Sequence, residues 1–177
     1  RVVYYCMRFT MRRVSVTEYC GYAIPVLLLL GVAIRVHLYV LDRGLWLDEA
    51  MLAVGIIRHP IPMISAALDY VQQAPVGYVL TVKLSTLLFG NGPMALRLPA
   101  LLAGAAILPL VNIIARKLEL RPAARLLTVG LVSLNPYLIY YSNEVKQYSV
   151  DAFFAAVLLS VLIVDHRWRR LLLLGML

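Results

Sequence analysis

Apolar residues in this chain gather into long blocks separated by short charged stretches. Four blocks, at 21–41, 98–115, 126–142 and 148–164, are close to the roughly 20 residues that a helix needs to cross the hydrocarbon core of a bilayer. A further apolar stretch begins at 171 and is too short to cross. The pattern predicts an all-α fold, that of a polytopic helical membrane protein with four complete spans and an incomplete fifth.

The apolar stretch at 75–90 decides the topology. It is short, begins with Pro75, ends with Gly90 and carries Lys83 near its middle, which suits an amphipathic helix lying on the membrane surface better than a span. The residues at 42–97 then form one long external loop, and its first part has apolar residues at helical spacing. A loop of this length usually has a function.

The composition agrees with a membrane location. Of the 177 residues, 62% are hydrophobic and only 15% are charged, and the mean hydropathy is +0.83. Soluble domains are about 45–50% apolar and about 25% charged, so an ordinary soluble domain is excluded. The chain begins with Arg1 rather than Met and ends in the short apolar stretch. We therefore expect one membrane domain, 1–177, from the N-terminal part of a longer protein.

The charges predict which loops share a face. Lysine and arginine total 17 against 9 acidic residues, and the basic clusters precede the first span, join the second to the third, and follow the fourth. The positive-inside rule then predicts a cytoplasmic N-terminus, with 42–97 and 143–147 on the external face, and we expect the membrane to be the plasma membrane. Cys6 and Cys20 fall on the cytoplasmic side, where no structural disulfide is expected. No basic run has the aromatic interleaving of a nucleic-acid-binding protein, so no nucleic-acid partner is expected.

Asp48 and Glu49 directly follow the first span, beside Trp46, a residue type that anchors at membrane interfaces. Two interpretations are open. An aspartate at a helix N-cap, with a glutamate in the first turn, satisfies free backbone N–H groups and the helix dipole. An acid at a membrane surface can also serve as a general base or a ligand. The two roles are compatible.

The turn between the third and fourth spans is dense in polar groups. They are acids, a cation and hydroxyls, at Tyr140, Glu144, Lys146, Tyr148 and Asp151. A solvated turn would need only polarity, and we weigh this structural reading equally with a functional one. Asp151 is the more informative residue, because an acid in the first turn of a membrane helix is costly unless it faces protein or water. We predict that Asp48, Glu144 and Asp151 converge on one external cavity.

Three further polar residues have two interpretations each. Arg35 and His37, near the end of the first span, either extend outward to the interface or meet a lipid phosphate. Arg97, at the start of the second span, is either an interface anchor or the partner of an acid in the first loop. Gln72 and Gln73, before the surface helix, are weak signals taken alone.

Four short motifs follow one another at 45–50 (LWLDEA), 73–78 (QAPVGY), 95–99 (ALRLP) and 140–148 (YYSNEVKQY). Their order and spacing resemble the N-terminal part of GT-C membrane glycosyltransferases, in the group related to the protein O-mannosyltransferases and the lipid A aminoarabinose transferase. The similarity runs over about 45–164. That family has a long first external loop with juxtamembrane helices and a short second external loop, which is the topology that the charges predict.

The resemblance implies a transferase that moves a sugar from a polyprenyl-phosphate donor to a lipid, glycan or protein acceptor on the external face, among membrane lipids. Asp48 matches the family's catalytic aspartate and would act as general base, with Glu49 as its supporting neighbour. Glu144 and Lys146 match the second-loop motif, where an acid binds sugar hydroxyls and a cation meets the phosphate. The remaining candidate substrate-binding residues are Gln73, Arg97, Tyr148 and Asp151.

The chain departs from the family at one possible metal ligand. Relatives often carry His-Pro-Pro or Glu-Lys-Pro where this chain has Gln73-Ala74-Pro75, and glutamine is a poor ligand for a divalent ion. No metal ligand carries over at this position; the sequence requires no cofactor and leaves the use of a divalent metal open.

A membrane transporter or a non-catalytic membrane scaffold is the alternative class of protein. Transporters place polar or broken-helix features near the midplane, whereas here the acids gather at one external rim. Asn135-Pro136, within the third block, is the one feature that favours transport.

Overall fold

The computed structural model describes residues 16–63 and 72–164, and all secondary structure in these ranges is helical. Outside them lie the basic residues before the first span, Cys6, the basic cluster after the fourth span and the incomplete span from 171. The described elements are α1 (Val16–Val40), α2 (Leu47–Arg58), the 3-10 turn η1 (Ile61–Met63), α3 (Val76–Phe89), α4 (Pro93–Lys117), α5 (Pro122–Leu134), α6 (Pro136–Tyr141) and α7 (Tyr148–Val164).

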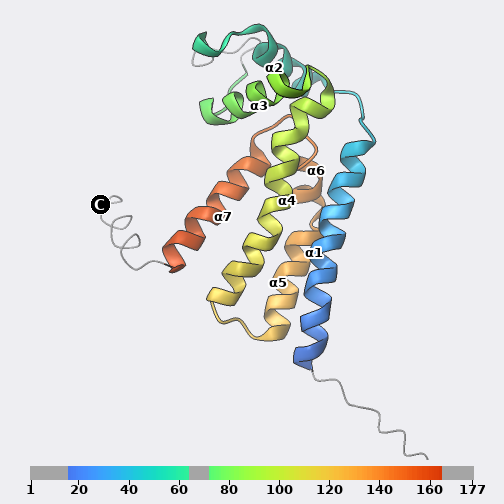
Figure 1. The fold of residues 1–177 in the computed structure, drawn as a ribbon, viewed down its shortest axis with the longest axis vertical. Helices are drawn as coiled ribbons and strands as arrows, with labels where there is room; N and C mark the ends of the chain where they lie inside the picture. The colour runs from blue at the N-terminus through green and yellow to red at the C-terminus, as the bar shows by residue number, and fades with distance from the viewer. Residues whose placement is uncertain (1–15, 64–71, 165–177) are drawn as a thin grey trace, which may run out of the picture.

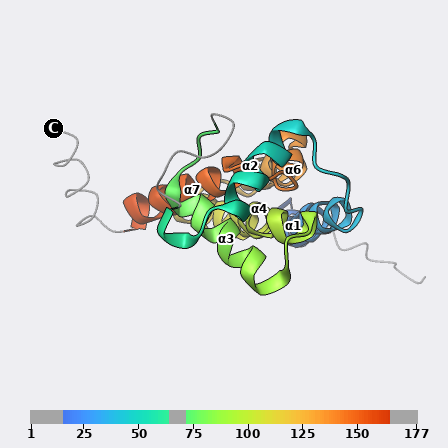
Figure 2. The same cartoon turned by 90° about the horizontal axis from the view of Figure 1, so that it is seen from above.

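Helices α1, α4, α5 and α7 run along the long axis of the molecule, while α2 and α3 lie across one end (Figure 1). Seen from above, α2 and α3 cover that end of the bundle (Figure 2). α4 is central, because it packs against α1, α3, α5 and α7. The turn between α4 and α5, flanked by Lys117 and Arg121, lies at the opposite end, so the fold separates this basic cluster from α2 and α3 (Figure 1).

Most of the predicted helices are confirmed, with small shifts at their ends. α7 covers the expected 148–164, and α3 fills the expected surface helix. α1 begins before the first apolar block and ends one residue before the end of that block. α4 begins at Pro93, ahead of the second block, because a proline in the first helical turn lacks only an N–H that would have no partner there.

The third block, expected as a span over 126–142, is divided between two helices. α5 ends at Leu134, α6 begins at Pro136, and Asn135 between them is extended, with φ −61° and ψ 120°. Pro136 breaks the helix because it has no N–H and disfavours the helical conformation in the preceding residue. Asn135 then caps α6, since its side-chain oxygen accepts hydrogen bonds from the N–H groups of Tyr137 and Leu138 at 2.9 and 3.0 Å.

Two helical stretches, Tyr19–Val40 and Pro93–Lys117, are long and apolar enough to cross a membrane. α5 and α7 are also apolar but shorter, at 13 and 17 residues. By length and composition, the described residues therefore support two of the four expected spans.

The expectation that Arg35 extends outward is also wrong. Arg35 is fully buried, at 0% exposure, and its guanidinium donates to the backbone oxygens of Gly31 and Ser133 at 2.9 Å each and of Val132 at 3.3 Å. Val132 and Ser133 lie in the last turn of α5, where carbonyl groups have no partner within the helix. Arg35 thus satisfies the helix end that the break creates, while His37 is exposed as expected.

Two glycines allow close approaches in the bundle. A Cβ at Gly104 would lie 2.4 Å from the Cβ of Ser142, so the backbone of α4 lies against the start of the 142–147 loop. A Cβ at Gly31 would lie 3.0 Å from side-chain atoms of both Leu108 and Ser133, which brings α1 close to α4 and α5. Small residues at these points therefore fix the position of the loop and of three helices.

Candidate functional site

Three connecting segments meet at the end of the bundle that α2 and α3 cover: 41–46, 72–75 and 142–147. Hydrogen bonds join the first and third segments to each other and join all three to side chains of α2. Beneath them, buried apolar side chains of α2, α3, α4 and α7 form one core, and Val145 of the 142–147 loop belongs to it. This core therefore fixes the position of the polar groups above it.

Glu49 is the central acid of this end and is fully buried, at 0% exposure. Its carboxylate forms a two-pronged ion pair with Arg97 of α4, in which Nε and Nη2 donate at 3.1 and 2.7 Å. It also accepts the backbone N–H of Val145 at 2.7 Å and that of Trp46 at 3.3 Å. Arg97 in turn donates to the backbone oxygens of Arg43 and Gly44 at 2.6 and 3.2 Å. The pair therefore joins α2 and α4 to the 41–46 and 142–147 segments.

Glu144 is likewise buried, and both of its carboxylate oxygens have donors. One oxygen is paired with Arg43, and the other accepts the indole N–H of Trp46 at 2.6 Å. Arg43 also donates to the backbone oxygen of Asn143 at 3.1 Å, and its guanidinium carbon lies 5.2 Å from the ring centroid of Tyr140. In this arrangement Glu144 holds the 142–147 loop against the 41–46 segment and does not present its carboxylate to a ligand.

Asp48 differs from these two acids because its side chain is 37% exposed. Its Oδ2 lies 2.5 Å from the ammonium of Lys146, and its Oδ1 accepts a hydrogen bond from Gln72 Nε2 at 3.0 Å. The Lys146 ammonium also donates to Gln72 Oε1 at 3.3 Å, so the three side chains close a ring. The hydrogen bond from Lys146, and secondarily that from Gln72, holds the pKa of the Asp48 carboxyl below its ordinary value.

The capping interpretation is corrected in one respect. Trp46, not Asp48, is the N-cap of α2, and Asp48 turns toward Lys146 and Gln72. The acid that meets the helix start is Glu49, which accepts the N–H of Trp46 in half of a capping box. Among the described residues, Asp48 therefore contacts Lys146 and Gln72 and no backbone N–H at the helix start.

The other predicted site residues divide into those that join the site and those that do not. Arg97 is the partner of a first-loop acid, one of its two predicted roles, and it is buried. Tyr148 is partly exposed, and its ring meets that of Tyr141 edge-on at a centroid distance of 4.7 Å. Asp151 and Gln73 are exposed, and among the described residues the structure gives their side chains no hydrogen-bond partner.

Sequence reasoning missed three members of the site. Gln72 rather than Gln73 contacts Asp48, while Arg43 and the Trp46 indole hold Glu144. A signal for Arg43 was available, because a buried acid requires a cation or several donors, and Arg43 lies a few residues before Asp48 and Glu49. Nothing in the spacing distinguishes Gln72 from its neighbour.

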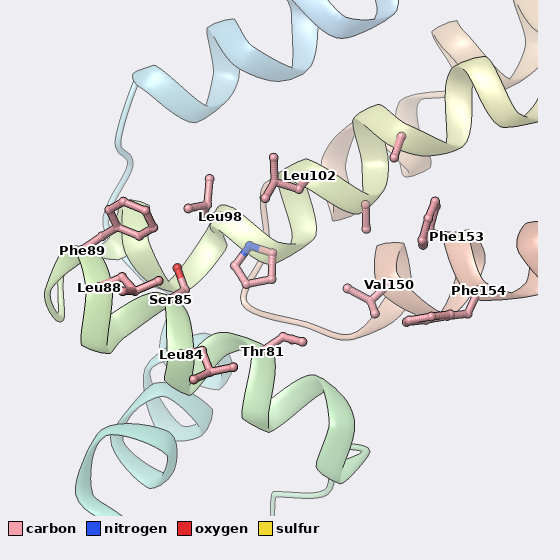
Figure 3. A pocket seen from close by; sticks show the side chains of 13 residues that line it. Thr81, Leu84, Ser85, Leu88, Phe89, Leu98, Leu102, Val150, Phe153 and Phe154 are labelled. Atoms are coloured by element: carbon pink, nitrogen blue, oxygen red, sulfur yellow. The ribbon is translucent and has the colours of Figure 1, made fainter. Parts of the chain in front are cut away.

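An apolar groove of about 470 Å³ lies between α3, α4 and α7 (Figure 3). Leu84, Leu88 and Phe89 line it from α3, and Phe153 and Phe154 line it from α7. Two polar side chains are in its lining. The hydroxyls of Thr81 and Ser85 already donate to backbone oxygens, at 2.7 and 2.6 Å. The groove surface is consequently suited to a hydrocarbon.

Within the described ranges, no group of three or more His, Cys, Asp or Glu side chains could hold a metal ion. Cys20 is a buried free thiol.

No protein-family model, curated protein or solved structure matches the chain. The chemistry of the site therefore has to be argued from its own geometry.

Proposed function

We propose that this chain is the N-terminal part of a GT-C-type membrane glycosyltransferase, which moves a sugar from a polyprenyl-phosphate donor to a lipid, glycan or protein acceptor. The observation that carries the proposal is the contrast within the site: Asp48 is exposed and contacts a cation, whereas Glu49 and Glu144 beside it are buried and fully paired. Those two pairs hold Asp48 and Lys146 in place. The site can therefore act on a ligand without losing the contacts that build it.

The substrate class follows from the two surfaces at this end. A cation with a neighbouring carboxylate suits a phosphate-linked sugar with an attacking hydroxyl, and the apolar groove between α3, α4 and α7 suits a hydrocarbon chain. Val150, in the wall of the groove, belongs to the same buried core as Val145, the residue before Lys146. An amphiphilic donor matches this combination better than a soluble nucleotide sugar.

The reaction is a direct displacement. An acceptor hydroxyl attacks the anomeric carbon, and Asp48 takes its proton as the new C–O bond forms. The bond between the anomeric carbon and the phosphate oxygen breaks, its electron pair passes to that oxygen, and Lys146 stabilises the negative charge of the leaving lipid phosphate. The anomeric configuration inverts. No cofactor enters this scheme.

The membrane frame of the proposal has four spans. α1 and α4 cross first and second, α5 with α6 forms a third span broken at Asn135, and α7 forms the fourth. α3 lies at the external surface, where its exposed Leu87, Leu88 and Phe89 meet the lipid. The polar site then faces the exterior of the plasma membrane, and the α4–α5 turn, with its basic residues, faces the cytoplasm.

The test is sugar transfer by membranes that contain the full-length protein, with a panel of radiolabelled polyprenyl-phosphate sugars. We expect Asp48→Asn to lower transfer by about 10²–10⁴-fold, because general base catalysis contributes about that factor. Asp42→Asn is the matched control, since it makes the same chemical change at another exposed acid of this end of the chain. It should leave transfer unchanged.

Three results of this assay distinguish the glycosyltransferase proposal, and the role of Asp48 in it, from their alternatives. Loss of transfer in Asp48→Asn alone, at equal expression and equal thermal stability, supports the proposal. Equal transfer by wild type and Asp48→Asn removes Asp48 from the mechanism. The absence of transfer by wild type with every donor contradicts the glycosyltransferase proposal.

A transporter is the second candidate, because the helix break at Asn135-Pro136 is a feature that transporters use for binding. In transporters, carbonyl groups at such breaks coordinate the cargo. Here the carbonyl oxygens of Val132 and Ser133 accept from Arg35 instead. Transport into proteoliposomes that is lost on changing Asn135 and retained in Asp48→Asn would favour this alternative.

A further inference from the structure

The observation behind this inference is that both oxygens of the Asp48 carboxylate are occupied. Lys146 lies 2.5 Å from one oxygen and Gln72 donates to the other at 3.0 Å. A carboxylate stabilised in this way has a reduced affinity for protons. A general base needs the opposite property, so the arrangement in the structure is unsuited to accept the proton of a hydroxyl.

Lys146 can exchange its contact with Asp48 for another acceptor. An ammonium group has three N–H donors, and the described residues provide acceptors for only two of them, Asp48 Oδ2 and Gln72 Oε1. The side chain of Lys146 is 11% exposed and that of Asp48 is 37% exposed, so solvent reaches the pair through Asp48, and ion pairs that solvent reaches are worth little free energy. A phosphate can therefore compete with Asp48 for this cation.

The other charges around Asp48 cannot make the same exchange. Glu49, next on the helix, is paired with Arg97, and Glu144 is paired with Arg43. Lys83, on α3, donates to the backbone oxygens of Ile56 and Ile57 at the end of α2. Among the described residues, Lys146 is the cation that touches Asp48.

We propose that Lys146 is exchanged from Asp48 to the phosphate of an incoming lipid-linked substrate, and that Gln72 is the positioning residue that holds both partners during the exchange. The ammonium–carboxylate contact breaks and an ammonium–phosphate contact forms, with no covalent change. Gln72 keeps its amide N–H on Asp48 and its amide oxygen on Lys146, so the two groups stay adjacent. Donor binding thus converts Asp48 from a masked carboxylate into an active base, and the donor has to bind before the acceptor reacts.

This inference rests on the proposed function for the identity of the anion, a prenyl phosphate. The test uses the full chain in detergent and measures how fast a water-soluble carbodiimide, with an added amine, modifies Asp48 at different pH. The carbodiimide modifies protonated carboxyl groups, so the midpoint of the pH profile reports the Asp48 pKa. Peptide mass spectrometry reads Asp48 and Asp42 in the same sample, and Asp42 corrects for reagent consumed by phosphate.

Farnesyl phosphate should raise the Asp48 midpoint by one pH unit or more, because an opposite charge within about 4–6 Å lowers a carboxyl pKa by about 1–3 units and its departure reverses this. Farnesol and inorganic phosphate are the matched probes, since each carries one half of the ligand. A response to inorganic phosphate at the same concentration would identify the ligand as free phosphate and overturn the lipid-linked form of the proposal.

Three variants test the roles of Lys146 and Gln72. Lys146→Met should raise the midpoint without ligand and remove the response to farnesyl phosphate, whereas Lys146→Arg should retain part of the response. Gln72→Ala should keep the shift in midpoint but lower kcat more than it raises KM, because Lys146 and Asp48 are no longer held together. Equal kcat in Gln72→Ala and wild type would remove the positioning role.

The comparison of wild type with and without farnesyl phosphate does not depend on how well any variant folds. An unchanged Asp48 midpoint at saturating farnesyl phosphate overturns the exchange. Sugar transfer with an unchanged midpoint would leave the glycosyltransferase proposal standing and reject the exchange alone. A shifted midpoint without transfer from any donor would do the reverse.

Discussion

Asp48 and Glu49 occupy consecutive positions in the first turn of α2, yet one carboxylate is 37% exposed and the other is 0% exposed. Glu49 accepts from four donors, which lie on α4, on the 142–147 loop and at the start of its own helix. Asp48 has one cation and one amide, both of which reach it from loops.

Helix geometry explains the difference. Successive side chains point about 100° apart around a helix, so one of two neighbouring acids can face the bundle while the other faces outward. The inward acid needs full pairing, because a buried charge without partners costs several kcal/mol. The outward acid is free of that constraint, and its partners can be exchanged. Of two adjacent acids on a helix, the inward one can therefore stabilise the fold while the outward one is available for a reaction.

The largest effect expected from this comparison is on stability. Glu49→Ala leaves Arg97 as a buried, unpaired cation and should lower the free energy of unfolding by about 3–5 kcal/mol. Asp48→Asn should lower it by about 1 kcal/mol, since solvent reaches the weakened pair through the Asp48 side chain, which is 37% exposed against 11% for Lys146. Denaturant unfolding of both variants in the same detergent measures the two values. Equal losses would show that Asp48 is as structural as Glu49.

The next effect concerns the loop that carries Lys146. Gly104→Ala places a Cβ 2.4 Å from that of Ser142, so the loop has to shift, at a cost of about 1–3 kcal/mol. Gly130→Ala is the control, because its Cβ would meet only Leu27 at an ordinary 3.6 Å. It should be neutral or stabilising by up to about 1 kcal/mol. Thermal unfolding distinguishes the two, and a neutral Gly104→Ala would show that the loop is not held there.

A smaller effect is expected from pH. The folded pKa of Asp48 lies below its ordinary value, so the contact with Lys146 stabilises the fold fully above the unfolded pKa of about 3.9 and is lost as the pH falls through the folded pKa. Because Asp48 is over a third exposed, the loss should be at most about 1 kcal/mol and should shrink with added salt.

Lys146→Met provides the measurement. The unfolding free energy of wild type should exceed that of Lys146→Met near neutral pH, and the difference should close on acidification below about pH 4. A difference that grows on acidification would contradict the sign of the shift.

The smallest expected effect is the change in unfolding free energy when the buried Tyr78 loses its hydroxyl. The Tyr78 side chain is 3% exposed, its hydroxyl has no hydrogen-bond partner among the described residues, and burial raises its pKa. Tyr78→Phe removes a polar group that gains nothing from the fold, so the unfolding free energy should stay the same or rise slightly. A loss of more than about 1 kcal/mol would reveal a partner for the hydroxyl.

Much of the helical framework could be predicted from the sequence, because apolar length alone fixes α3 and α7. Hydropathy gives one apolar run over the third block, and Asn135-Pro136 stands out in it only as a possible polar or broken-helix feature; the stereochemistry of proline ends the helix there.

The site is less predictable for a different reason. Its contacts join residues far apart in the chain: 48 positions separate Glu49 from Arg97, and 96 separate Glu49 from Val145. Motif resemblance selected Asp48, Glu49, Glu144 and Lys146, but only the packing of α2 shows which carboxylate is open.

The burial of Arg35 also has a consequence for the order in which the chain is made. Its backbone acceptors on Val132 and Ser133 lie 97 and 98 residues further along the chain. A ribosome synthesises α1 long before these acceptors exist, and Gly31, on α1 itself, is the one early partner among the described residues. α1 can therefore take its final position in the bundle only after α5 has been made. In a nascent chain that stops before Val132, the Arg35 guanidinium lacks the two α5 acceptors and keeps only Gly31 O.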